Sequence, residues 1–378
     1  MKKIAVFIGV YLPGFRSGGP VKSVANMVAV LGDSYEFEIY TSDRDSGMDR
    51  PYEGIFLNSP VVVGRALVFY CAKNLTGLFF YIRSLLSNSA NIFYLNSFFS
   101  FKYSIMPLVL ICLSCRGRII VLAPRGEFSI GALSIKSRKK KAFLVLAKFS
   151  GVYRNLIWHA SNHSEKDDIY RAFGASANVR IATDLAVSGW NEKIEATKFD
   201  DLLKVVFLSR ICEMKNIHAT VEIFAKVNCK VVLDVYGPIE DVSYWNAFLA
   251  KASALPSNVV VNYRGVACPH DAISIISDYD LFLLPTMGEN FGHVIAEALF
   301  AGVPVLISDR TPWTNMAERN LGWSLPLDDL SEFSRCVEFC AAMSPSSFVE
   351  WRRSIQKWAN ENIGNESAIK GNRELFLI

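Results

Sequence analysis

The pattern of apolar and polar positions is clearest between residues 281 and 308, LFLLPTMGENFGHVIAEALFAGVPVLIS. Residues 281–285 form a continuous apolar run, as in strands that are buried on both faces of a sheet. After the polar break MGEN, apolar residues recur from Phe291 at the spacing of three and four positions that packs one face of a helix on a sheet. Gly302 stands where a helix commonly ends, and a second apolar run follows it. The pattern predicts a strand, a crossover helix and a second parallel strand.

Similar apolar runs recur along the whole chain and alternate with amphipathic stretches. They predict strands at residues 4–10, 37–40, 92–95, 119–122, 156–161, 204–209, 231–237, 259–265 and 280–285, and late helices at 331–342 and 347–360. Strands that alternate with helices are typical of parallel α/β sheets. The 378 residues exceed the ~250 to 300 at which a single hydrophobic core stops growing. We therefore predict an α/β protein with two Rossmann-like domains.

The composition of the chain indicates which binding partners and which cellular compartment are to be expected. The chain has 40 Lys and Arg against 36 Asp and Glu, a net charge of +4, which is too balanced to indicate a nucleic-acid partner. No apolar run approaches the roughly 20 residues of a membrane-spanning helix, and the longest favours a buried helix, expected over residues 97–115. The apolar N-terminus lacks a small-residue cleavage site and is interpreted as the first strand. Eight cysteines without a disulfide framework favour a reducing cytoplasm.

Two carboxylates, Glu289 and Glu297, flank the start of the helix predicted after residue 290. Eight helical steps turn by about 80° and rise by about 12 Å, so the two groups cannot form one acid pair. Between them, the free amides and the dipole of the helix start favour an anion such as phosphate; the residues concerned are Asn290, Phe291, Gly292 and His293. A ligand with a central phosphate and a hydroxyl-rich group at each end fits this arrangement, and a nucleotide sugar is such a ligand.

The same residues carry a family resemblance. GENFG, the E-x7-E pair and EALFAGVPV resemble the donor-site signature of retaining glycosyltransferases of the GT-B fold, specifically glycosyltransferase family 4, or glycosyl transferases group 1. The resemblance implies two Rossmann-like domains facing a central cleft, with Glu289 on the donor hexose and Glu297 on the ribose. The alternative is an ordinary βαβ unit with two surface glutamates.

The resemblance also implies how the chain divides. Residues 1–187 would form an acceptor-side domain, and residues 202–360 a domain that binds the nucleotide-sugar donor. Residues 188–201 are polar, lack an apolar period and are predicted to be the linker. In GT-B proteins the last helix commonly crosses back to the first domain, so we expect residues 361–378 to pack there.

Two cations follow the strand predicted at residues 204–209. Arg210 and Lys215 lie at its carboxyl end, the edge at which open α/β sheets bind ligands. The resemblance implies that they hold the donor diphosphate and that the Pro-Trp step ending at Trp313 closes the donor site. Arg210, Lys215 and Glu289 are therefore the candidate catalytic residues, because cations aimed at a departing diphosphate stabilise its developing charge. Two unrelated surface cations are the alternative.

In the first half, the loop after the first strand is glycine-rich. Gly14, Gly18 and Gly19 do not match G-x-G-x-x-G, so nicotinamide dinucleotide binding loses its main support. The resemblance implies that Gly18 and Gly19 approach the donor phosphates and the acceptor; a plain turn is the alternative. Arg125 follows another strand where some relatives carry a His, and it would either bind an acceptor phosphate or cap its loop.

Several short patterns could suggest metal or redox chemistry, but core packing or chance explains each better. They are the cysteines at 112 and 115, the histidines at 159 and 163, and DxD at 43–45 and 278–280. The cysteines have apolar neighbours, a turn separates the histidines, and relatives of this type generally need no metal for chemistry. We expect neither a metal nor another cofactor.

A basic run precedes an apolar helix at Lys136–Lys148. Such a segment favours either attachment to an anionic membrane surface or a solvated helix start. The resemblance favours attachment to the membrane, since many such enzymes extend glycans on lipid diphosphate carriers at the inner leaflet. The protein is accordingly expected in the cytoplasm, with peripheral attachment to the inner face of the cytoplasmic membrane as one alternative.

The resemblance thus implies a retaining hexosyl- or N-acetylhexosaminyltransferase. Its donor would be a nucleotide diphosphate sugar and its acceptor a glycan or lipid-linked saccharide, as in the assembly of O-antigen, capsule or exopolysaccharide. Without a convincing covalent nucleophile, front-face attack is the mechanism that the resemblance implies. The alternatives are an epimerase or phosphorylase of the same fold, and a non-catalytic nucleotide-sugar-binding subunit of a glycan assembly complex.

Overall fold

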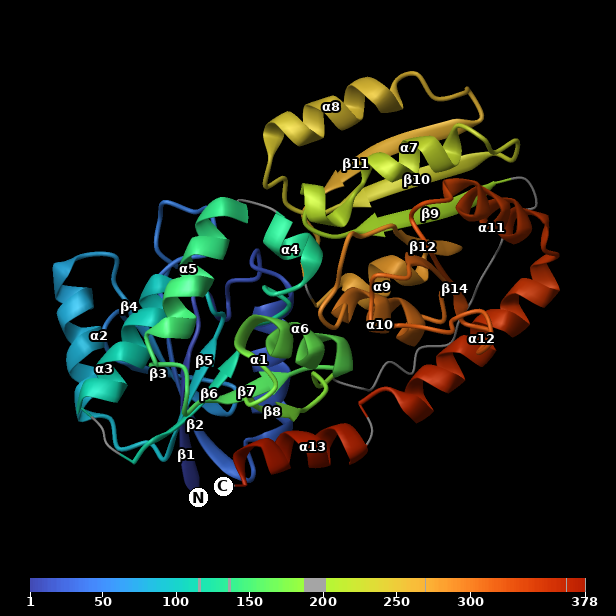
Figure 1. The fold of residues 1–378 in the computed structure, drawn as a ribbon. Helices are drawn as coiled ribbons and strands as arrows, with labels where there is room; N and C mark the ends of the chain where they lie inside the picture. Colours follow the sequence, from blue (N-terminus) through green and yellow to red (C-terminus); the bar gives the residue numbers. More distant parts are fainter. Residues whose placement is uncertain (115–116, 135–136, 187–201, 269, 365, 378) are drawn as a thin grey trace. The chain divides into compact units, whose positions relative to one another are not determined.

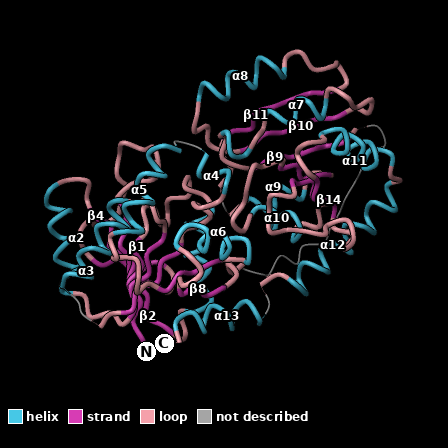
Figure 2. The backbone as a smooth tube through the Cα atoms, in the orientation of Figure 1, coloured by secondary structure: helices cyan, strands magenta, loops and turns pink. Residues whose placement is uncertain are grey.

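A computed structural model describes residues 1–114, 117–134, 137–186, 202–268, 270–364 and 366–377 of the chain (Figure 1). The chain separates into two compact units, one from residues 1–187 and 364–378 and the other from residues 188–363. The predicted linker, residues 188–201, lies outside the described residues. In each unit a sheet is flanked by helices, as the colouring by secondary structure makes plain (Figure 2).

The first unit is built on an eight-stranded sheet with the order β3-β4-β2-β1-β5-β6-β7-β8. All neighbouring strands are parallel except β3 and β4. The strands are β1 (Lys2–Phe7), β2 (Tyr35–Ser42), β3 (Pro60–Val63), β4 (Ala66–Cys71), β5 (Ile92–Asn96), β6 (Ile119–Ala123), β7 (Ile157–Ala160) and β8 (Asn178–Ile181). Strands β3, β4 and β8 were not predicted; β3 and β8 are the edge strands, and each is short and half exposed.

Helices cover both faces of this sheet. They are α1 (Gly19–Leu31), α2 (Leu75–Ser87), α3 (Met106–Ser114), α4 (Ile130–Ser134), α5 (Ser137–Phe149), α6 (His163–Phe173) and α13 (Glu366–Phe376). Helices α1 and α13 share one apolar core, which includes Leu31 and Phe376. Helices α2, α3, α5 and α6 share the core of the other face, which includes Tyr81, Leu108 and Ile169. The final helix therefore belongs to the first unit, where the Tyr35 hydroxyl donates to the Arg373 carbonyl at 3.2 Å.

The helix predicted over residues 97–115 is wrong at its start. Residues 97–100 form a loop, a π-helical turn follows at Phe101–Ile105, and only then does α3 begin. The half-buried Glu127 carboxylate explains the difference, because it accepts hydrogen bonds from the Ser97 hydroxyl and from the Phe98 and Phe99 amides. A side-chain carboxyl oxygen competes well for backbone amides that would otherwise enter a helix.

The second unit has a six-stranded sheet with the order β11-β10-β9-β12-β13-β14, and all its neighbouring strands are parallel. The strands are β9 (Leu203–Leu208), β10 (Val231–Tyr236), β11 (Val259–Gly265), β12 (Leu281–Leu284), β13 (Val305–Ser308) and β14 (Gly322–Leu325). The helices are α7 (His218–Phe224), α8 (Val242–Ala252), α9 (Ala272–Ser277), α10 (His293–Phe300), α11 (Leu330–Ala342) and α12 (Pro345–Asn362). The βαβ unit predicted at residues 281–308 is confirmed as β12, α10 and β13.

The strand order of the second unit reverses between two neighbours. From β9 the chain adds β10 and β11 on one side, then returns to place β12, β13 and β14 on the other side. The loops that follow β9 and β12 consequently leave the same edge of the sheet in opposite directions. Such a switch point is where open α/β sheets bind their ligands.

Candidate functional site

An ion pair joins the two loops at the switch point of the second unit. Lys215 ends a short 3-10 turn after β9, and Glu289 lies in the loop between β12 and α10. Although they are 74 residues apart in sequence, the Lys215 ammonium donates to the Glu289 carboxylate. Their side chains are only 12% and 11% exposed. Two of the three candidate catalytic residues are thus in direct contact in a nearly buried position.

Backbone hydrogen bonds hold the loops around this pair. The Met214 carbonyl, next to Lys215, accepts from the Met287 amide at 2.8 Å and from the Thr286 hydroxyl at 3.0 Å. The Ser308 hydroxyl at the end of β13 donates to the Thr286 carbonyl at 2.6 Å. The loops after β9, β12 and β13 are therefore linked to one another, which fixes the positions from which Lys215 and Glu289 extend.

Arg210, the third candidate catalytic residue, lies two residues beyond the end of β9. Its guanidinium donates to the Glu240 carboxylate at 2.6 Å, and the two side chains are 35% and 37% exposed. Burial acts to lower the pKa of Arg210, but the nearby carboxylates of Glu240 and Glu289 outweigh it and raise the pKa. Arg210 therefore stays cationic within the field of Glu289. Nothing in the local sequence pattern around Glu240 marks it as a partner of Arg210.

The start of α10 depends on a glycine and a tryptophan. Gly292 caps the helix with a left-handed backbone, φ 78°, and a Cβ there would lie 2.9 Å from the Ile295 side chain. The Trp313 indole N–H donates to the Phe291 carbonyl, and the two rings lie 5.6 Å apart. The Pro-Trp loop after β13 therefore packs against the turn before α10. The first-turn amides of α10 point out of the helix, as at every helix N-terminus.

The remaining candidate residues of this loop and helix are buried or half buried. Asn290 and Phe291 are half buried, while His293 and Glu297 are each 8% exposed. Glu297 lies within α10, beyond its first turn, whereas Glu289 precedes the helix. Two surface glutamates on an ordinary βαβ unit would not be buried in this way.

The glycines of the first unit also lie at a switch point. Gly18 caps α1 with φ 67°, and a Cβ added to Gly19 would meet no atom within 4 Å, so open space lies beside it. Their loop follows β1, whose neighbours β2 and β5 lie on opposite sides of it. The Asp45 carboxylate holds the loop by accepting from the Phe15 and Arg16 amides at 2.9 and 3.2 Å. Gly18 and Gly19 thus belong to the first unit and the residues described above to the second.

Arg125 lies in the interior of the first unit. Its side chain is 6% exposed, and its guanidinium donates to Asp184, to the Asn96 side chain at 2.7 Å and to the Tyr94 hydroxyl at 2.9 Å. Burial acts to lower its pKa, but the neighbouring Asp184 carboxylate raises it, so the charge persists. These contacts are those of a structural residue that fixes the loop after β6.

His159 belongs to the same network. Its Nδ1 lies 2.7 Å from the Tyr94 hydroxyl, and its Nε2 lies 2.7 Å from the Ala182 carbonyl. Burial and the charge of Arg125 lower its pKa to about 4, so the ring is neutral near pH 7. Within the described residues no group of three or more His, Cys, Asp or Glu side chains could hold a metal ion. The part of the chain that the structure describes also has no helix long and apolar enough to span a membrane.

The second unit, which carries these residues, is similar to part of a known protein family, and the chain as a whole is similar to several solved structures. Residues 190–325, which include Arg210, Lys215, Glu289 and Glu297, match the model of the family described as Glycosyl transferases group 1. HepE from Anabaena in complex with UDP and glucose superposes with a TM-score of 0.69, 14% identity, and coverage of 99% of this chain and 98% of that one. Sucrose-phosphate synthase from Thermosynechococcus elongatus superposes with a TM-score of 0.74, 12% identity, and coverage of 100% and 98%. The chain has the GT-B fold.

WaaG, a glycosyltransferase involved in lipopolysaccharide biosynthesis, shares this GT-B fold with a TM-score of 0.70, 14% identity, and coverage of 99% of this chain and 100% of that one. None of the curated proteins matches the chain in sequence. At these identities the structural likeness defines the fold, while the family match is confined to the unit that carries the Lys215–Glu289 pair.

Proposed function

We propose that the protein is a retaining glycosyltransferase. It would move a hexose or N-acetylhexosamine from a nucleotide diphosphate sugar to a glycan or lipid-linked saccharide during the assembly of a bacterial surface polysaccharide. The observation that carries this proposal is the nearly buried Lys215–Glu289 pair at the switch point of the second sheet, with Arg210 within the same electrostatic field. The match of this region to a glycosyltransferase family model supports it.

The ion pair suits a ligand that carries both a diphosphate and a sugar. In the free protein the Lys215 ammonium and the Glu289 carboxylate neutralise each other. A donor offers each of them a replacement, because the diphosphate attracts the ammonium and the sugar hydroxyls donate to the carboxylate. Binding would therefore separate the two charges without leaving either unpaired, which is the costly outcome for a buried charge.

Catalysis would follow from the same charges. As the bond between sugar and diphosphate breaks, negative charge grows on the diphosphate, and cations fixed in a poorly solvated position stabilise it more than water does. Lys215 and Arg210 would supply these cations, assisted by the first-turn amides of α10. Retention would follow if the acceptor attacks from the face that the diphosphate leaves and passes its proton to the diphosphate. Glu297 would accept hydrogen bonds from the ribose hydroxyls.

A panel of nucleotide sugars tests this function. A true donor at about 100 times its Kd should raise the free energy of unfolding by ~2.7 kcal/mol, which a thermal shift detects. Incubation with that donor should then release nucleoside diphosphate and transfer the sugar to an acceptor without added metal and in the presence of EDTA. Isomerisation of the nucleotide sugar in the absence of an acceptor would indicate an epimerase. Binding of the nucleotide sugar without any product would indicate a binding subunit. Absence of stabilisation by every donor contradicts the proposal.

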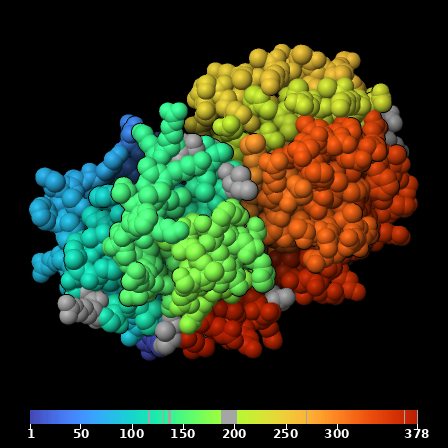
Figure 3. Space-filling model, viewed as in Figure 1, coloured from blue at the N-terminus to red at the C-terminus, as the bar shows by residue number. Residues whose placement is uncertain are grey.

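We further propose that a lipid-linked acceptor is reached at an anionic membrane surface through α5. Side chains of this helix are strongly exposed at Val145 (55%), Leu146 (69%) and Phe149 (83%). Four cations on the same helix, Arg138, Lys139, Lys141 and Lys148, are also exposed, and α5 lies at the surface of the first unit (Figure 3). Apolar side chains beside cations are the combination that binds at the headgroup level of anionic bilayers.

Vesicle sedimentation tests this attachment. The protein should sediment with phosphatidylglycerol vesicles and less with phosphatidylcholine vesicles, and Leu146→Ser with Phe149→Ser should reduce sedimentation. Val242→Ser is the matched control, because Val242 is 65% exposed on α8 of the second unit. Equal sedimentation of both variants with anionic vesicles would exclude α5 as the attachment.

A further inference from the structure

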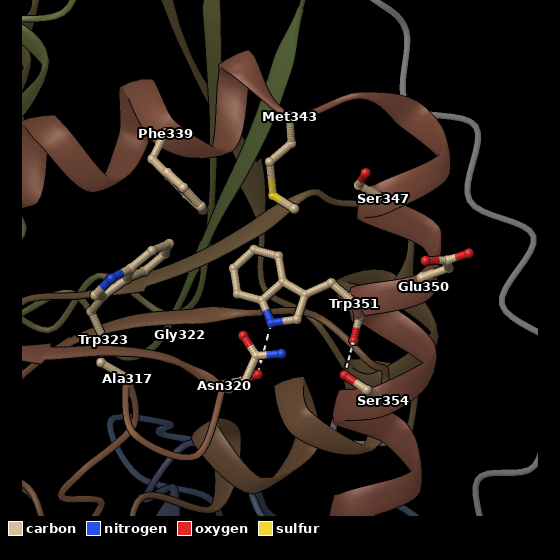
Figure 4. Close-up of a pocket in the computed structure, with 10 residues that line it drawn as sticks. All are labelled: Ala317, Asn320, Gly322, Trp323, Phe339, Met343, Ser347, Glu350, Trp351 and Ser354. Atoms are coloured by element: carbon tan, nitrogen blue, oxygen red, sulfur yellow. Dashed lines mark hydrogen bonds between the residues drawn. The ribbon is translucent and has the colours of Figure 1, made fainter.

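A pocket of about 550 Å³ lies in the second unit among β14, α11 and α12 (Figure 4). Its volume falls within the range of small-molecule sites. Trp323 enters from β14, Phe339 and Met343 from the end of α11, and Trp351 from α12. In the close-up, these four side chains converge on one central space (Figure 4).

This pocket is separate from the Lys215–Glu289 site. All neighbouring strands of the second sheet are parallel, so their amino ends share one edge and their carboxyl ends the other. Trp323 is the second residue of β14 and therefore lies at the amino edge. Lys215 and Glu289 follow β9 and β12 at the carboxyl edge. A ligand in the pocket would not occupy the proposed transfer site.

The aromatic walls are held in place before any ligand binds. The Trp323 ring lies edge to face with Phe339 at 5.6 Å and with Trp351 at 5.7 Å. The Trp351 indole N–H donates to the Asn320 carbonyl at 2.7 Å, which fixes the orientation of that ring. Phe339 is 55% exposed, so much of its ring is accessible at the mouth. Preformed aromatic surface binds a ligand at a small cost in side-chain entropy.

The polar residues around these walls restrict the charge of the ligand. They are Asn320, Ser347, Glu350 and Ser354, and the described lining contains no Lys or Arg. Glu350 is exposed and would repel a phosphate or another anion that no cation offsets. A purely apolar ligand would cover the hydroxyl and amide groups of the lining. These groups would lose the hydrogen bonds that they make to water and gain none in return. The lining therefore favours a neutral ligand that has both apolar faces and hydroxyl groups.

We propose that this pocket binds a neutral saccharide at a site distinct from the transfer site. The C–H faces of a pyranose ring would pack on Trp323 and Phe339, and its hydroxyls would donate to the Glu350 carboxylate and exchange hydrogen bonds with the Asn320 side chain. The inference rests on the pocket alone and does not depend on the transferase activity proposed above.

Fluorine NMR of the whole chain labelled with 5-fluorotryptophan tests the proposal. The chain has seven tryptophans, and single Trp→Phe variants assign the resonances of Trp323, Trp351 and Trp313. Titration with neutral trisaccharides of glucose, galactose and mannose should shift the Trp323 and Trp351 resonances for at least one sugar. The resonance of Trp313, which packs beside α10 at the carboxyl edge of the sheet, should not shift during that titration.

Variants then locate the binding surface. Phe339→Ala should lower by about tenfold the affinity for the saccharide that shifts the Trp323 resonance, since aromatic contact area dominates such sites. Phe339 is largely exposed, so this variant should fold, as its thermal unfolding verifies. Tyr263→Ala is the matched control, because Tyr263 is 41% exposed on β11 and does not line the pocket. The control should bind as the unchanged protein does.

Four outcomes would overturn the proposal. The Trp323 and Trp351 resonances could stay unshifted with every saccharide, or Phe339→Ala could bind with unchanged affinity. Choline could also shift Trp323 where the sugars do not, and the site would then be an aromatic cage for a cation beside Glu350. A response of Trp313 alone would place the sugar at the transfer site, which would support the transferase and contradict the pocket.

Discussion

Two clusters of paired charges lie at the carboxyl ends of parallel strands, and they differ in how completely the cation is engaged. In the first unit, the Arg125 guanidinium donates to Asp184, Asn96 and Tyr94 at once and is 6% exposed. In the second unit, the Lys215 ammonium donates to Glu289 alone among the hydrogen bonds that we observe for it, in the part of the chain that the structure describes.

The difference teaches which cluster can accept a ligand. A planar guanidinium whose three nitrogens each donate to a protein acceptor cannot turn toward a substrate without taking the cation away from the buried Asp184 carboxylate. A lysine has three donors on a flexible stem, so Lys215 can keep one contact and offer another. The first cluster is therefore suited to fixing the fold, and the second to exchanging partners with a charged ligand.

The largest expected effect concerns stability at the first cluster. Arg125→Met should lower the free energy of unfolding by about 3 to 5 kcal/mol, because it removes the cation that offsets the buried charge of the Asp184 carboxylate. Urea denaturation measures the change. Arg335→Met is the control, since it removes a surface pair with Glu332 in which Arg335 is 67% exposed, and it should cost about 1 kcal/mol or less. Equal losses for the two variants would remove the distinction between the clusters.

The next effect concerns turnover at the second cluster. Lys215→Ala and Arg210→Ala should each lower turnover by about 10²-fold, equivalent to ~3 kcal/mol of lost transition-state stabilisation. The unfolding free energy of Arg210→Ala should change far less than that of Arg125→Met, because Arg210 and its partner Glu240 are 35% and 37% exposed. Lys251→Ala, an exposed lysine on α8, is the control and should retain full turnover. Unchanged turnover in both site variants would exclude the diphosphate role.

A smaller effect should appear in nucleotide binding. Glu297→Ala should lower the affinity for the nucleotide about tenfold, or ~1.4 kcal/mol, if the Glu297 carboxylate accepts hydrogen bonds from the ribose hydroxyls. Calorimetric titration measures the Kd. Glu361→Ala, on the exposed side of α12, provides the control. Equal affinities would leave Glu297 as a buried structural residue like those around Arg125.

The last expected effect is a pH dependence of the first cluster. The folded-state pKa of His159, about 4, lies below its ordinary value of 6.5, so the unfolded chain binds the extra proton between these values. The stability that neutral His159 contributes is complete above about pH 6.5 and falls as the pH drops toward 4, by at most ~1.4 kcal/mol per pH unit. His159→Gln removes this titration. Denaturation of both proteins between pH 7 and pH 5 should give a shallower slope for the variant, and identical slopes would contradict the assignment.

The sequence predicted the parts of this molecule that depend on neighbours along the chain. The apolar run at 281–285, the helical spacing after Phe291 and Gly302 at the helix end were sufficient for β12, α10 and β13. The same method placed a helix too early at residues 97–115. The acceptor that captures those amides, Glu127, comes about 30 residues later and leaves no trace in the local pattern.

Only the tertiary structure decided which charged residues meet and how far each is engaged. Arg125, Arg210 and Lys215 all look alike in sequence, each in a polar loop after an apolar strand. The order of the strands brings Lys215 to Glu289 across 74 residues and Arg125 to Asp184 across 59. Periodicity fixes which face a side chain takes, because that depends on steps of two or three to four residues. The partner on that face depends on long-range strand pairing, which is why the two clusters could be separated only in the folded protein.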